Sequence, residues 1–445
     1  MTFTEEQTLT NHLQHFIACQ TISNENLEKV DWREFTKLHA LLEAYYPVIY
    51  KTFEVIPVGR AGLLFHYDSG HPEKTPLVLS AHQDVVEPGA LELWKKEPFS
   101  GAYEDGIIWG RGTTDCKHLF LAEMEAVEAA FADGFRPSYD LYIALGYSEE
   151  IYTISGEDGG RLLKEALAAR GVHQIVLFDE GGSVTTDDKG HRIAHVGLGD
   201  KSQIVYELYK DGTGGHSSVP GLRTDMGALA RCIVALEDHP RPYKLTDLSR
   251  GQLKGMAKLE TGDKQRIFSD PDRYWDEVCE LARQDARLDA LLHTTMCVTM
   301  AQGANQPNVI PAHVSATISA RVLPGETGDE ILAYIQQYLT GGIQVRRVSG
   351  IDPVNEDTPD SEEFRLVEQT IHDVYGDDVI VMPELMLFAT DSRYYKDIAR
   401  HIFLFSGYEQ DDSWGPMHGV NERIPAAALP GARNFFRRLM ENYNA

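Results

Sequence analysis

The sequence predicts an α/β protein with a mostly parallel sheet flanked by helices and a second α+β domain inserted into the first. Helical patterns alternate with short apolar strands over the first 199 residues, which is typical of parallel sheets. The 445 residues exceed one ordinary hydrophobic core. After Gly199 the pattern changes to alternating strands and a charged helical stretch. We therefore expect a first domain of residues 1–199 and 351–445 and an inserted domain of residues 200–350.

Hydrophobic periodicity orders the elements of the first domain. Helical spacing predicts helix over residues 3–46, and two strands follow at Val48–Val58 and Gly62–Tyr67. The next predicted strands are Leu77–Ser80, Leu141–Leu145 and Ile175–Phe178. Between them lie two predicted helices, Lys117–Ala132 and Gly160–Ala169. After the insert, a helix, two strands and a last helix are predicted at Glu362–Tyr375, Val379–Met382, Ile402–Phe405 and from about Ala426.

The inserted segment has the pattern of helices on an antiparallel sheet. Its predicted strands are Ser202–Leu208, Thr294–Met300, Val314–Leu323 and Ile343–Val348. Its predicted helices are Asp225–Glu237 and Glu330–Leu339, with a charged helical region over residues 245–292. Period-two alternation in the strands predicts a sheet with one buried and one exposed face.

Three apolar strands of the first domain each run into acidic or imidazole side chains. These are His82 and Asp84, then Glu149 and Glu150, then Asp179 and Glu180. Ligands of open α/β sheets bind outside the carboxyl ends of the strands, so these groups should share one cleft. Asp115, on a Gly-rich loop before a helix, can join them. So many acids repel each other unless cations lie among them.

The ligand types in this cluster predict the metal. Together with His418 they form a mixed nitrogen and oxygen set, which suits zinc, or cobalt or manganese in its place. His82 and Asp84 face the same side of an extended chain, so Asp84 can orient the imidazole. Two ions about 3.5–4 Å apart need a carboxylate that bridges them. Asp115, on its Gly-rich loop, is the candidate for this bridge. Adjacent glutamates 149 and 150 should divide the roles of ligand and general base, and the sequence leaves open which is which.

Composition excludes several classes of function. The formal charge of −27 argues against nucleic-acid binding and against anionic membrane surfaces. The first residues lack the basic and apolar regions of a signal peptide, and no apolar run reaches the length of a membrane span. Five scattered cysteines without a C-x-x-C pair are typical of reduced thiols, so we expect a cytoplasmic protein.

These motifs, in this order, resemble the dinuclear zinc metallopeptidase family of aminoacylase, glutamate carboxypeptidase and acetylornithine deacetylase. The chain is most similar to the branch of carboxypeptidase S and the N-acyl-amino-acid amidohydrolases. The resemblance extends from about Leu77 to Arg423. It rests on Ala81–Val86, Trp94, Pro98–Gly101, Gly110–Asp115, Glu149–Glu150, Asp179–Gly182, Gly215–Ser218, Arg321–Gly325, Asp391–Arg393 and His418–Arg423.

The resemblance implies a role for each candidate residue. One zinc ion would take His82, Asp115 and Asp179, and the other would take Asp115, Glu150 and His418. Glu149 would be the general base, and Asp84 would orient His82. The insert would be a lid and dimerisation domain, whose His216 would steady the oxyanion in the partner subunit of a homodimer. Arg321, with Asn308 nearby, would hold a substrate carboxylate, and Arg393 is a further candidate.

Each of these residues also has an ordinary structural explanation. His216 lies in a Gly/Ser-rich loop and could be a surface histidine, Arg321 could form a surface ion pair, and Asn308 could set a turn. The chain also departs from the family pattern at Ser148, at Cys116 and over Ile151–Ile154. These departures spare the proposed ligands, so they concern the substrate pocket. A thiol at position 116 would make activity sensitive to oxidation.

The sequence therefore predicts a di-zinc hydrolase of N-acyl amino acids or short peptides with a free C-terminal carboxylate. Its partners would be small substrates and a second copy of the chain. A dipeptidase or an aminopeptidase of the same family is the alternative within enzymes. A non-catalytic dimeric scaffold is the alternative outside them, and the intact Glu149 beside a full ligand set argues against it.

Overall fold

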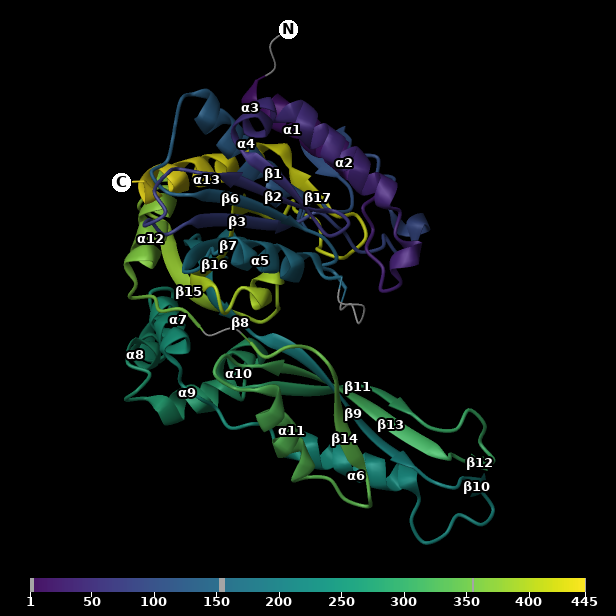
Figure 1. The fold of residues 1–445 in the computed structure, drawn as a ribbon. Coiled ribbons are helices and arrows are strands. Elements are labelled where there is room, and N and C mark those ends of the chain that lie inside the picture. Colours follow the sequence, from purple (N-terminus) through teal and green to yellow (C-terminus); the bar gives the residue numbers. More distant parts are fainter. Residues whose placement is uncertain (1–3, 152–156, 354–355, 445) are drawn as a thin grey trace. The chain divides into compact units, whose positions relative to one another are not determined.

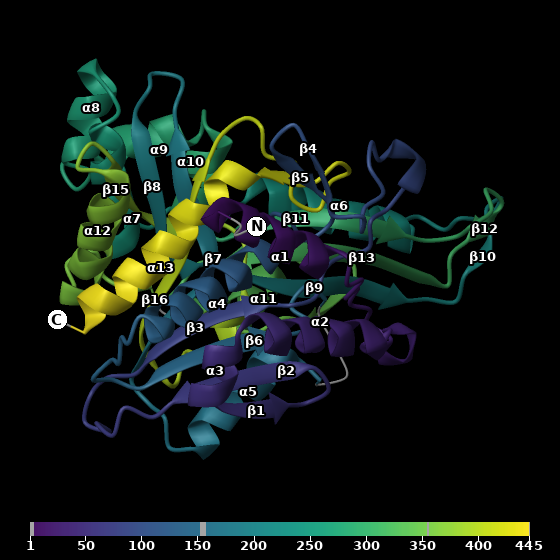
Figure 2. The ribbon, with the colours of Figure 1, turned by 90° about the horizontal axis from the view of Figure 1, so that it is seen from above.

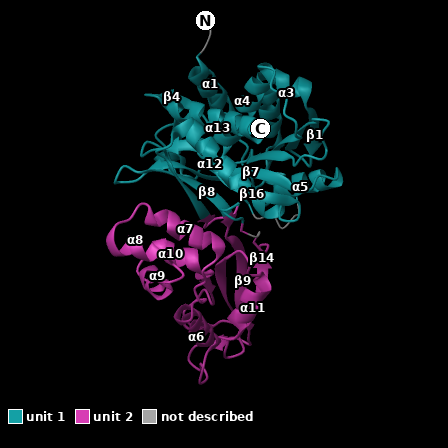
Figure 3. Ribbon diagram, turned by 90° about the vertical axis from the view of Figure 1, so that its left-hand side faces the viewer, with its two compact units in different colours: residues 1–198, 357–384, 390–445 teal, residues 199–356, 385–389 magenta. Residues whose placement is uncertain are grey.

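The computed structural model describes residues 4–151, 157–353 and 356–444 (Figure 1). The chain forms two compact units (Figure 3). Unit 1 comprises residues 1–198, 357–384 and 390–445, and unit 2 comprises residues 199–356 and 385–389. No helix among the described residues is long and apolar enough to cross a membrane.

Unit 1 is built on an eight-stranded sheet in the order β1-β2-β6-β3-β7-β16-β8-β15. The four central strands, β6, β3, β7 and β16, run parallel to one another, which confirms the predicted mostly parallel sheet. Strands β1 and β2 add an antiparallel edge. In sheet order the strands span Glu54–Val58, Gly62–Tyr67, Leu141–Gly146, Leu77–His82, Ile175–Thr186, Ala399–Gln410, Arg192–Asp200 and Ile380–Met386.

Helices cover both faces of this sheet. Figure 2 shows α1 (Glu5–Ile17), α4 (Lys117–Ala132) and α13 (Leu429–Tyr443) across one face, and α5 (Gly159–Ala169) lies on the other in Figure 1. Helix α4 is buried on nearly every side, as its apolar sequence requires beneath α1 and α13. The other helices of unit 1 are η1 (Leu27–Lys29), α2 (Trp32–Tyr45), α3 (Pro47–Thr52), η2 (Leu91–Leu93), α12 (Glu362–Tyr375), η3 (Asp391–Tyr394) and η4 (Ala426–Ala428).

The N-terminal segment differs from the sequence prediction in two places. The predicted helix of residues 3–46 is interrupted after Ile17, and Ile22 there pairs with Val85 beside strand β3. The predicted strand Val48–Val58 is instead helix α3 followed by β1, because Pro47 occupies the first helical turn, where its fixed φ favours helix.

Strand β7 continues beyond the point where the sequence predicts its end. The sequence predicts a strand over Ile175–Phe178, yet the strand runs through Gly181 and Gly182 to Thr186. A Cβ atom on Gly181 would lie 2.6 Å from the backbone of Leu404, and one on Gly182 would lie 1.8 Å from the carbonyl oxygen of His195. The two glycines therefore serve the close approach of neighbouring strands rather than a turn. Three short strands complete unit 1 as a separate sheet, β4 (Ala102–Glu104), β5 (Ile107–Trp109) and β17 (Arg423–Pro425).

Unit 2 contains a four-stranded antiparallel sheet in the order β11-β13-β9-β14. These strands span Thr295–Gln302, His313–Val322, Ser202–Asp211 and Gln344–Ser349. Helices α6 (Asp225–Asp238) and α11 (Gly328–Gln336) pack their apolar faces on it in one core that includes Leu229, Ile331 and Ile318. The remaining elements are α7 (Asp247–Ala257), α8 (Gly262–Ser269), α9 (Trp275–Ala282), α10 (Ala286–Leu292), β10 (Gly215–His216) and β12 (Val309–Ile310).

The loop that carries Asp115 in unit 1 is held by a buried carboxylate far away in the sequence. Glu422 is fully buried, and its Oε1 accepts hydrogen bonds from the backbone N–H groups of Gly112 and Thr114, at 3.0 and 2.8 Å. Its Oε2 lies 2.5 Å from Nη1 of Arg111, which is also buried. Burial raises the pKa of Glu422, and these donors oppose that shift. The loop before α4 thus depends on one residue of the C-terminal segment.

Replacing Glu422 should destabilise the protein strongly. The change Glu422→Ala leaves the buried Arg111 guanidinium and two backbone N–H groups without their acceptor, so we expect a loss of about 3–5 kcal/mol. The shift of the urea unfolding midpoint measures it. The matched control is Glu104→Ala, which removes an exposed ion pair with Lys96 and should cost about 0–1 kcal/mol. Equal effects of the two changes would contradict the structural role of Glu422.

Candidate active site

His82 lies at the carboxyl end of β3, the buried central strand, and its orientation is fixed by the residue two positions later. Its Nδ1 lies 2.9 Å from the backbone carbonyl of Asp84 and 3.5 Å from the Asp84 carboxylate. The carbonyl can only accept, so Nδ1 carries a proton, and Nε2 is the nitrogen that faces the neighbouring carboxylates. Asp84 therefore orients His82 mainly through its backbone, where the sequence suggested its carboxylate.

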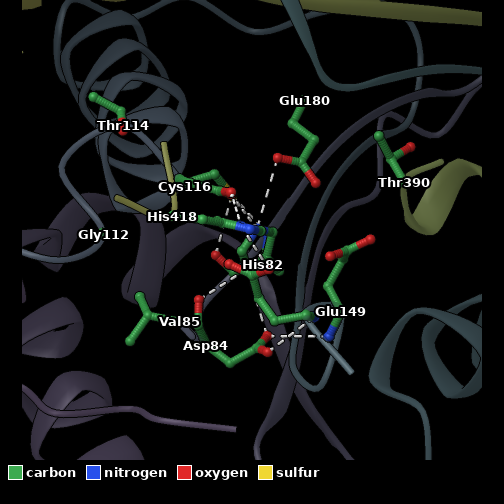
Figure 4. Close-up of polar contacts among 12 residues, drawn as sticks. His82, Asp84, Val85, Gly112, Thr114, Cys116, Glu149, Glu180, Thr390 and His418 are labelled. Carbon is green, nitrogen blue, oxygen red and sulfur yellow. Dashed lines mark hydrogen bonds and ion pairs between the residues drawn. The ribbon is translucent and has the colours of Figure 1, made fainter. Parts of the chain in front are cut away.

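Asp115 lies between two imidazoles. Its Oδ1 is 3.0 Å from Nε2 of His82, and its Oδ2 is 2.8 Å from Nε2 of His418. Burial alone would raise the pKa of Asp115, but its hydrogen bonds to the two histidines hold the pKa below its usual range. Figure 4 shows His418 close to His82. The two oxygens of one carboxylate thus face two separate nitrogen ligands, which is the arrangement of a carboxylate that bridges two cations.

The paired glutamates follow β6 on a sharply turned backbone. Ser148 has a φ of 64°, a conformation uncommon outside glycine and typical of strained functional turns. The turn directs the backbone N–H groups of Glu149 and Glu150 to the two oxygens of the Asp84 carboxylate, at 3.2 and 3.3 Å. The main task of the Asp84 carboxylate is therefore to hold this turn.

His418 comes from the C-terminal segment and completes a second group of ligands. Its Nε2 lies 2.9 Å from Oε2 of Glu150 as well as 2.8 Å from Asp115, and its φ is 58°. Arg111 donates to its backbone carbonyl at 3.2 Å. The side chain is half exposed, whereas that of His82 is 1% exposed. The His418 side of the cluster is thus the one open to solvent.

The charges in this cluster fit a metal site. Burial raises the pKa of Glu150 to about 7 and that of Glu180 well above its usual range. Hydrogen bonds to Asp115 and Glu150 raise the pKa of His418 to about 10. The buried Oε1 of Glu150 accepts no hydrogen bond from the described residues. Carboxylates crowded in this way with an unused buried oxygen are stabilised when a divalent cation replaces the protons.

Two groups of side chains have the spacing of metal ligands within the described residues. One consists of Asp115, Glu150 and His418, and the other of His82, Asp115, Cys116 and Glu180. The ligand atoms of each group lie within 4.8 Å of one another. Asp115 belongs to both groups. Four of the five expected ligands, His82, Asp115, Glu150 and His418, belong to these groups, and Glu180 belongs to them where Asp179 was expected.

The neighbouring acids of β7 have different partners. Oε2 of Glu180 lies 3.6 Å from Nε2 of His82. The Oδ2 of Asp179 instead accepts hydrogen bonds from the Thr390 hydroxyl and the Ser392 backbone N–H, both at 2.9 Å. Because β7 continues as a strand here, successive side chains point to opposite faces, and only one of the two acids can face His82. Asp179 therefore holds the segment that carries Arg393.

Arg393 contacts the residue expected to be the general base. Its Nη1 donates to Oε1 of Glu149 at 2.9 Å, and its Nη2 lies 3.4 Å from Asp391. In Figure 4 the Glu149 carboxylate points away from Asp84, toward Thr390. The guanidinium thus fixes one oxygen of Glu149. Arg393, expected as a further substrate-binding residue, forms an ion pair with Glu149 in this structure.

The other three candidates, His216, Asn308 and Arg321, belong to unit 2. They lie at two separate positions there. His216 in β10 lies opposite Val309 of β12, and Ser217 N–H donates to the carbonyl of Asn308 at 3.1 Å. His216 and Asn308 are therefore neighbours, and His216 is exposed. Arg321 lies eight residues along β13 from His313, about 26 Å at about 3.3 Å per residue. The expectation that Asn308 lies near Arg321 is wrong.

Sequence reasoning missed two parts of this site and could have found one of them. Glu180 was in the strand-end pattern, but the resemblance favoured its neighbour Asp179. Glu422 follows His418 in the quoted motif, yet no local pattern shows that it holds a loop some 310 positions earlier. Of the departures from the family pattern, Tyr152, Thr153 and Ile154 lie outside the described residues.

Comparison with known proteins agrees with this geometry. The chain is 29% identical to a probable carboxypeptidase S-like 2 of Dictyostelium discoideum, covering 92% of this chain and 79% of that protein. It is 29% identical to the human N-fatty-acyl-amino acid synthase/hydrolase PM20D1, covering 96% and 85%. The crystal structure of an M20 family metallo-carboxypeptidase, Sso-CP2 from Sulfolobus solfataricus, shares the fold with a TM-score of 0.71 at 18% identity, covering 99% and 100%.

A family model that matches most of the chain identifies the family. Residues 78–442 match the peptidase family M20/M25/M40, and this range contains every residue of the cluster described above. With both ligand groups in unit 1, this chain is a metal-dependent hydrolase that belongs to the peptidase family M20/M25/M40.

Proposed function

We propose that this protein is a dinuclear zinc hydrolase that cleaves the amide bond of N-acyl amino acids or short peptides with a free C-terminal carboxylate. The observation that carries the proposal is Asp115, whose two oxygens face His82 and His418 separately, at 3.0 and 2.8 Å. The names of the relatives support the substrate class, since one is a carboxypeptidase and another acts on N-fatty-acyl amino acids.

The residues divide between two ions. His82, Asp115 and Glu180 would hold one, and Asp115, Glu150 and His418 would hold the other. Imidazole and carboxylate ligands suit zinc, and cobalt or manganese can replace it. When bound, two such ions polarise the carbonyl of the substrate and lower the pKa of water. Asp179 remains the alternative to Glu180, although its Oδ2 is occupied by Thr390 and Ser392.

Glu149 is the proposed general base. It is held next to the proposed ligand Glu150 by the turn at Ser148, and its Oε1 accepts a hydrogen bond from Arg393. Its carboxylate would take a proton from the attacking water and deliver it to the leaving amine. The Arg393 guanidinium would hold one oxygen of Glu149 in place through its hydrogen bond from Nη1.

Unit 2 would supply the groups that bind the substrate. Arg321 can bind the free carboxylate through its guanidinium fork. His216 and Asn308 lie together and far from Arg321 along the sheet, so they would act as one group and Arg321 as another. We propose that His216 and Asn308 complete the site of the partner subunit in a homodimer, where His216 steadies the oxyanion.

Two alternative functions remain, one enzymatic and one non-catalytic. A dipeptidase or aminopeptidase of the same family would use the same cluster but would need an acidic group for the substrate amine. A non-catalytic scaffold would have no need of Glu149 beside a complete ligand set. The acid and amide substrates described below distinguish an aminopeptidase from the proposed hydrolase, and the general-base variant distinguishes a scaffold.

The change Glu149→Gln should abolish most turnover without removing the metals. A neutral amide cannot take the proton, so we expect kcat to fall roughly 10²- to 10⁴-fold. Steady-state kinetics measures the loss, and elemental analysis of the same samples measures the metal content, which should not change. The control Glu165→Gln removes an exposed ion pair with Arg161 and should leave both unchanged. Normal turnover in Glu149→Gln would assign the base to another residue.

The change Arg321→Met should affect only substrates with a free carboxylate. We expect KM for an N-acetyl amino acid to rise roughly 10- to 100-fold, as loss of a charge-assisted pair implies. The corresponding C-terminal amide should be a poor substrate of both proteins. Arg346→Met, in strand β14 of the same sheet and paired with Glu207, is the matched control. Equal cleavage of acid and amide by the unmodified enzyme would contradict the carboxylate anchor and favour an aminopeptidase.

A further inference from the structure

Cys116 lies inside the metal-ligand cluster, and neither the fold nor the proposed mechanism requires a thiol there. It immediately follows the bridging Asp115 and precedes the first residue of α4. Its Sγ belongs to the group formed with His82, Asp115 and Glu180, whose ligand atoms lie within 4.8 Å of one another. Figure 4 shows Cys116 and Glu180 near His82, with a dashed line joining Glu180 to the imidazole. The side chain therefore faces the cluster rather than the helix core.

The contacts of the sulfur place it at the end of β3. Sγ lies 3.4 Å from both the backbone nitrogen and the backbone oxygen of His82. The residue is 1% exposed and forms no disulfide. Tetrahedral zinc with bonds of about 2.0–2.3 Å has its ligand atoms roughly 3.3–3.8 Å apart. The four side chains are thus within a small adjustment of a closed tetrahedral set.

We propose that the sulfur of Cys116 is the fourth protein ligand of the ion bound by His82, Asp115 and Glu180. This inference rests on the proposed dinuclear function and goes beyond it by assigning a thiolate to one of the two ions. The sulfur binds as a thiolate, so one bond forms between sulfur and metal and the thiol proton passes to solvent. No electron is transferred in this step.

The two ions would then differ in character. The His82 site would have four protein ligands and would take water as a fifth, and its histidine is 1% exposed. The His418 site has three protein ligands, and its histidine is 50% exposed, so it keeps a position open for the substrate. A thiolate also selects soft cations, so the His82 site should prefer zinc, cobalt or cadmium over manganese.

Cobalt spectroscopy of the full-length protein tests this assignment. Metal-free protein is titrated with Co²⁺, and ultraviolet absorption is recorded for the sulfur-to-cobalt charge-transfer band that only a bound thiolate produces. We expect the band in the unmodified protein and its loss in Cys116→Ser, with visible cobalt bands still present. Cys116→Ala is the second variant if serine impairs folding. Cys297→Ser, which changes the exposed cysteine, is the matched control and should keep the band.

The outcomes separate this inference from the proposed function. Two bound cobalt ions, active enzyme and no charge-transfer band would overturn the Cys116 assignment and leave the hydrolase intact. A band that persists in Cys116→Ser and Cys116→Ala would assign the sulfur elsewhere and overturn it equally. Protein that binds no cobalt and hydrolyses no substrate would overturn both. Competition between Mn²⁺ and Cd²⁺ gives a second readout, because Cys116→Ser should lose the preference for cadmium.

Discussion

The burial of several carboxylates around one pair of imidazoles is the constraint on which the rest of unit 1 depends. Asp115, Glu150 and Glu180 lie together at the carboxyl edge of a parallel sheet. Desolvation and the neighbouring Asp115 carboxylate raise the pKa values of Glu150 and Glu180, whereas the two histidines hold the pKa of Asp115 down. Divalent cations remove this cost, and the two oxygens of Asp115 already face two nitrogen ligands. The arrangement therefore fits the binding of divalent cations, which the proposed function assigns to it.

Other buried carboxylates of unit 1 have a different task, because backbone N–H groups are their partners. Asp84 holds the turn with Glu149, Glu422 holds the loop before Asp115, and Asp179 holds the segment that carries Arg393. Each of these acids thus fixes a backbone segment that carries a residue of the cluster or a residue in contact with it. Ligands positioned in this way keep their orientation when the ions exchange, and such supporting residues affect metal affinity about as much as many ligands do.

The sequence predicted the parallel sheet and most of the cluster, because apolar strands that end in acids identify both. It could not predict where strand β7 ends, since a Gly–Gly pair signals a turn locally but here allows neighbouring backbones to approach. That continuation decides which acid, Asp179 or Glu180, faces His82. Sequence also placed Asn308 beside Arg321, and only the strand register separates them. The pairing of strands distant in the sequence thus determines which side chains lie together, and the local sequence pattern does not.

The most direct test of this account is a count of zinc ions per chain by native mass spectrometry, in the unmodified protein and in Asp115→Asn. If Asp115 bridges two ions, the unmodified protein carries two, and the single change removes or weakens both because each loses a ligand and its charge. Two ions retained at unchanged affinity in Asp115→Asn, or a single ion in the unmodified protein, would contradict the dinuclear centre.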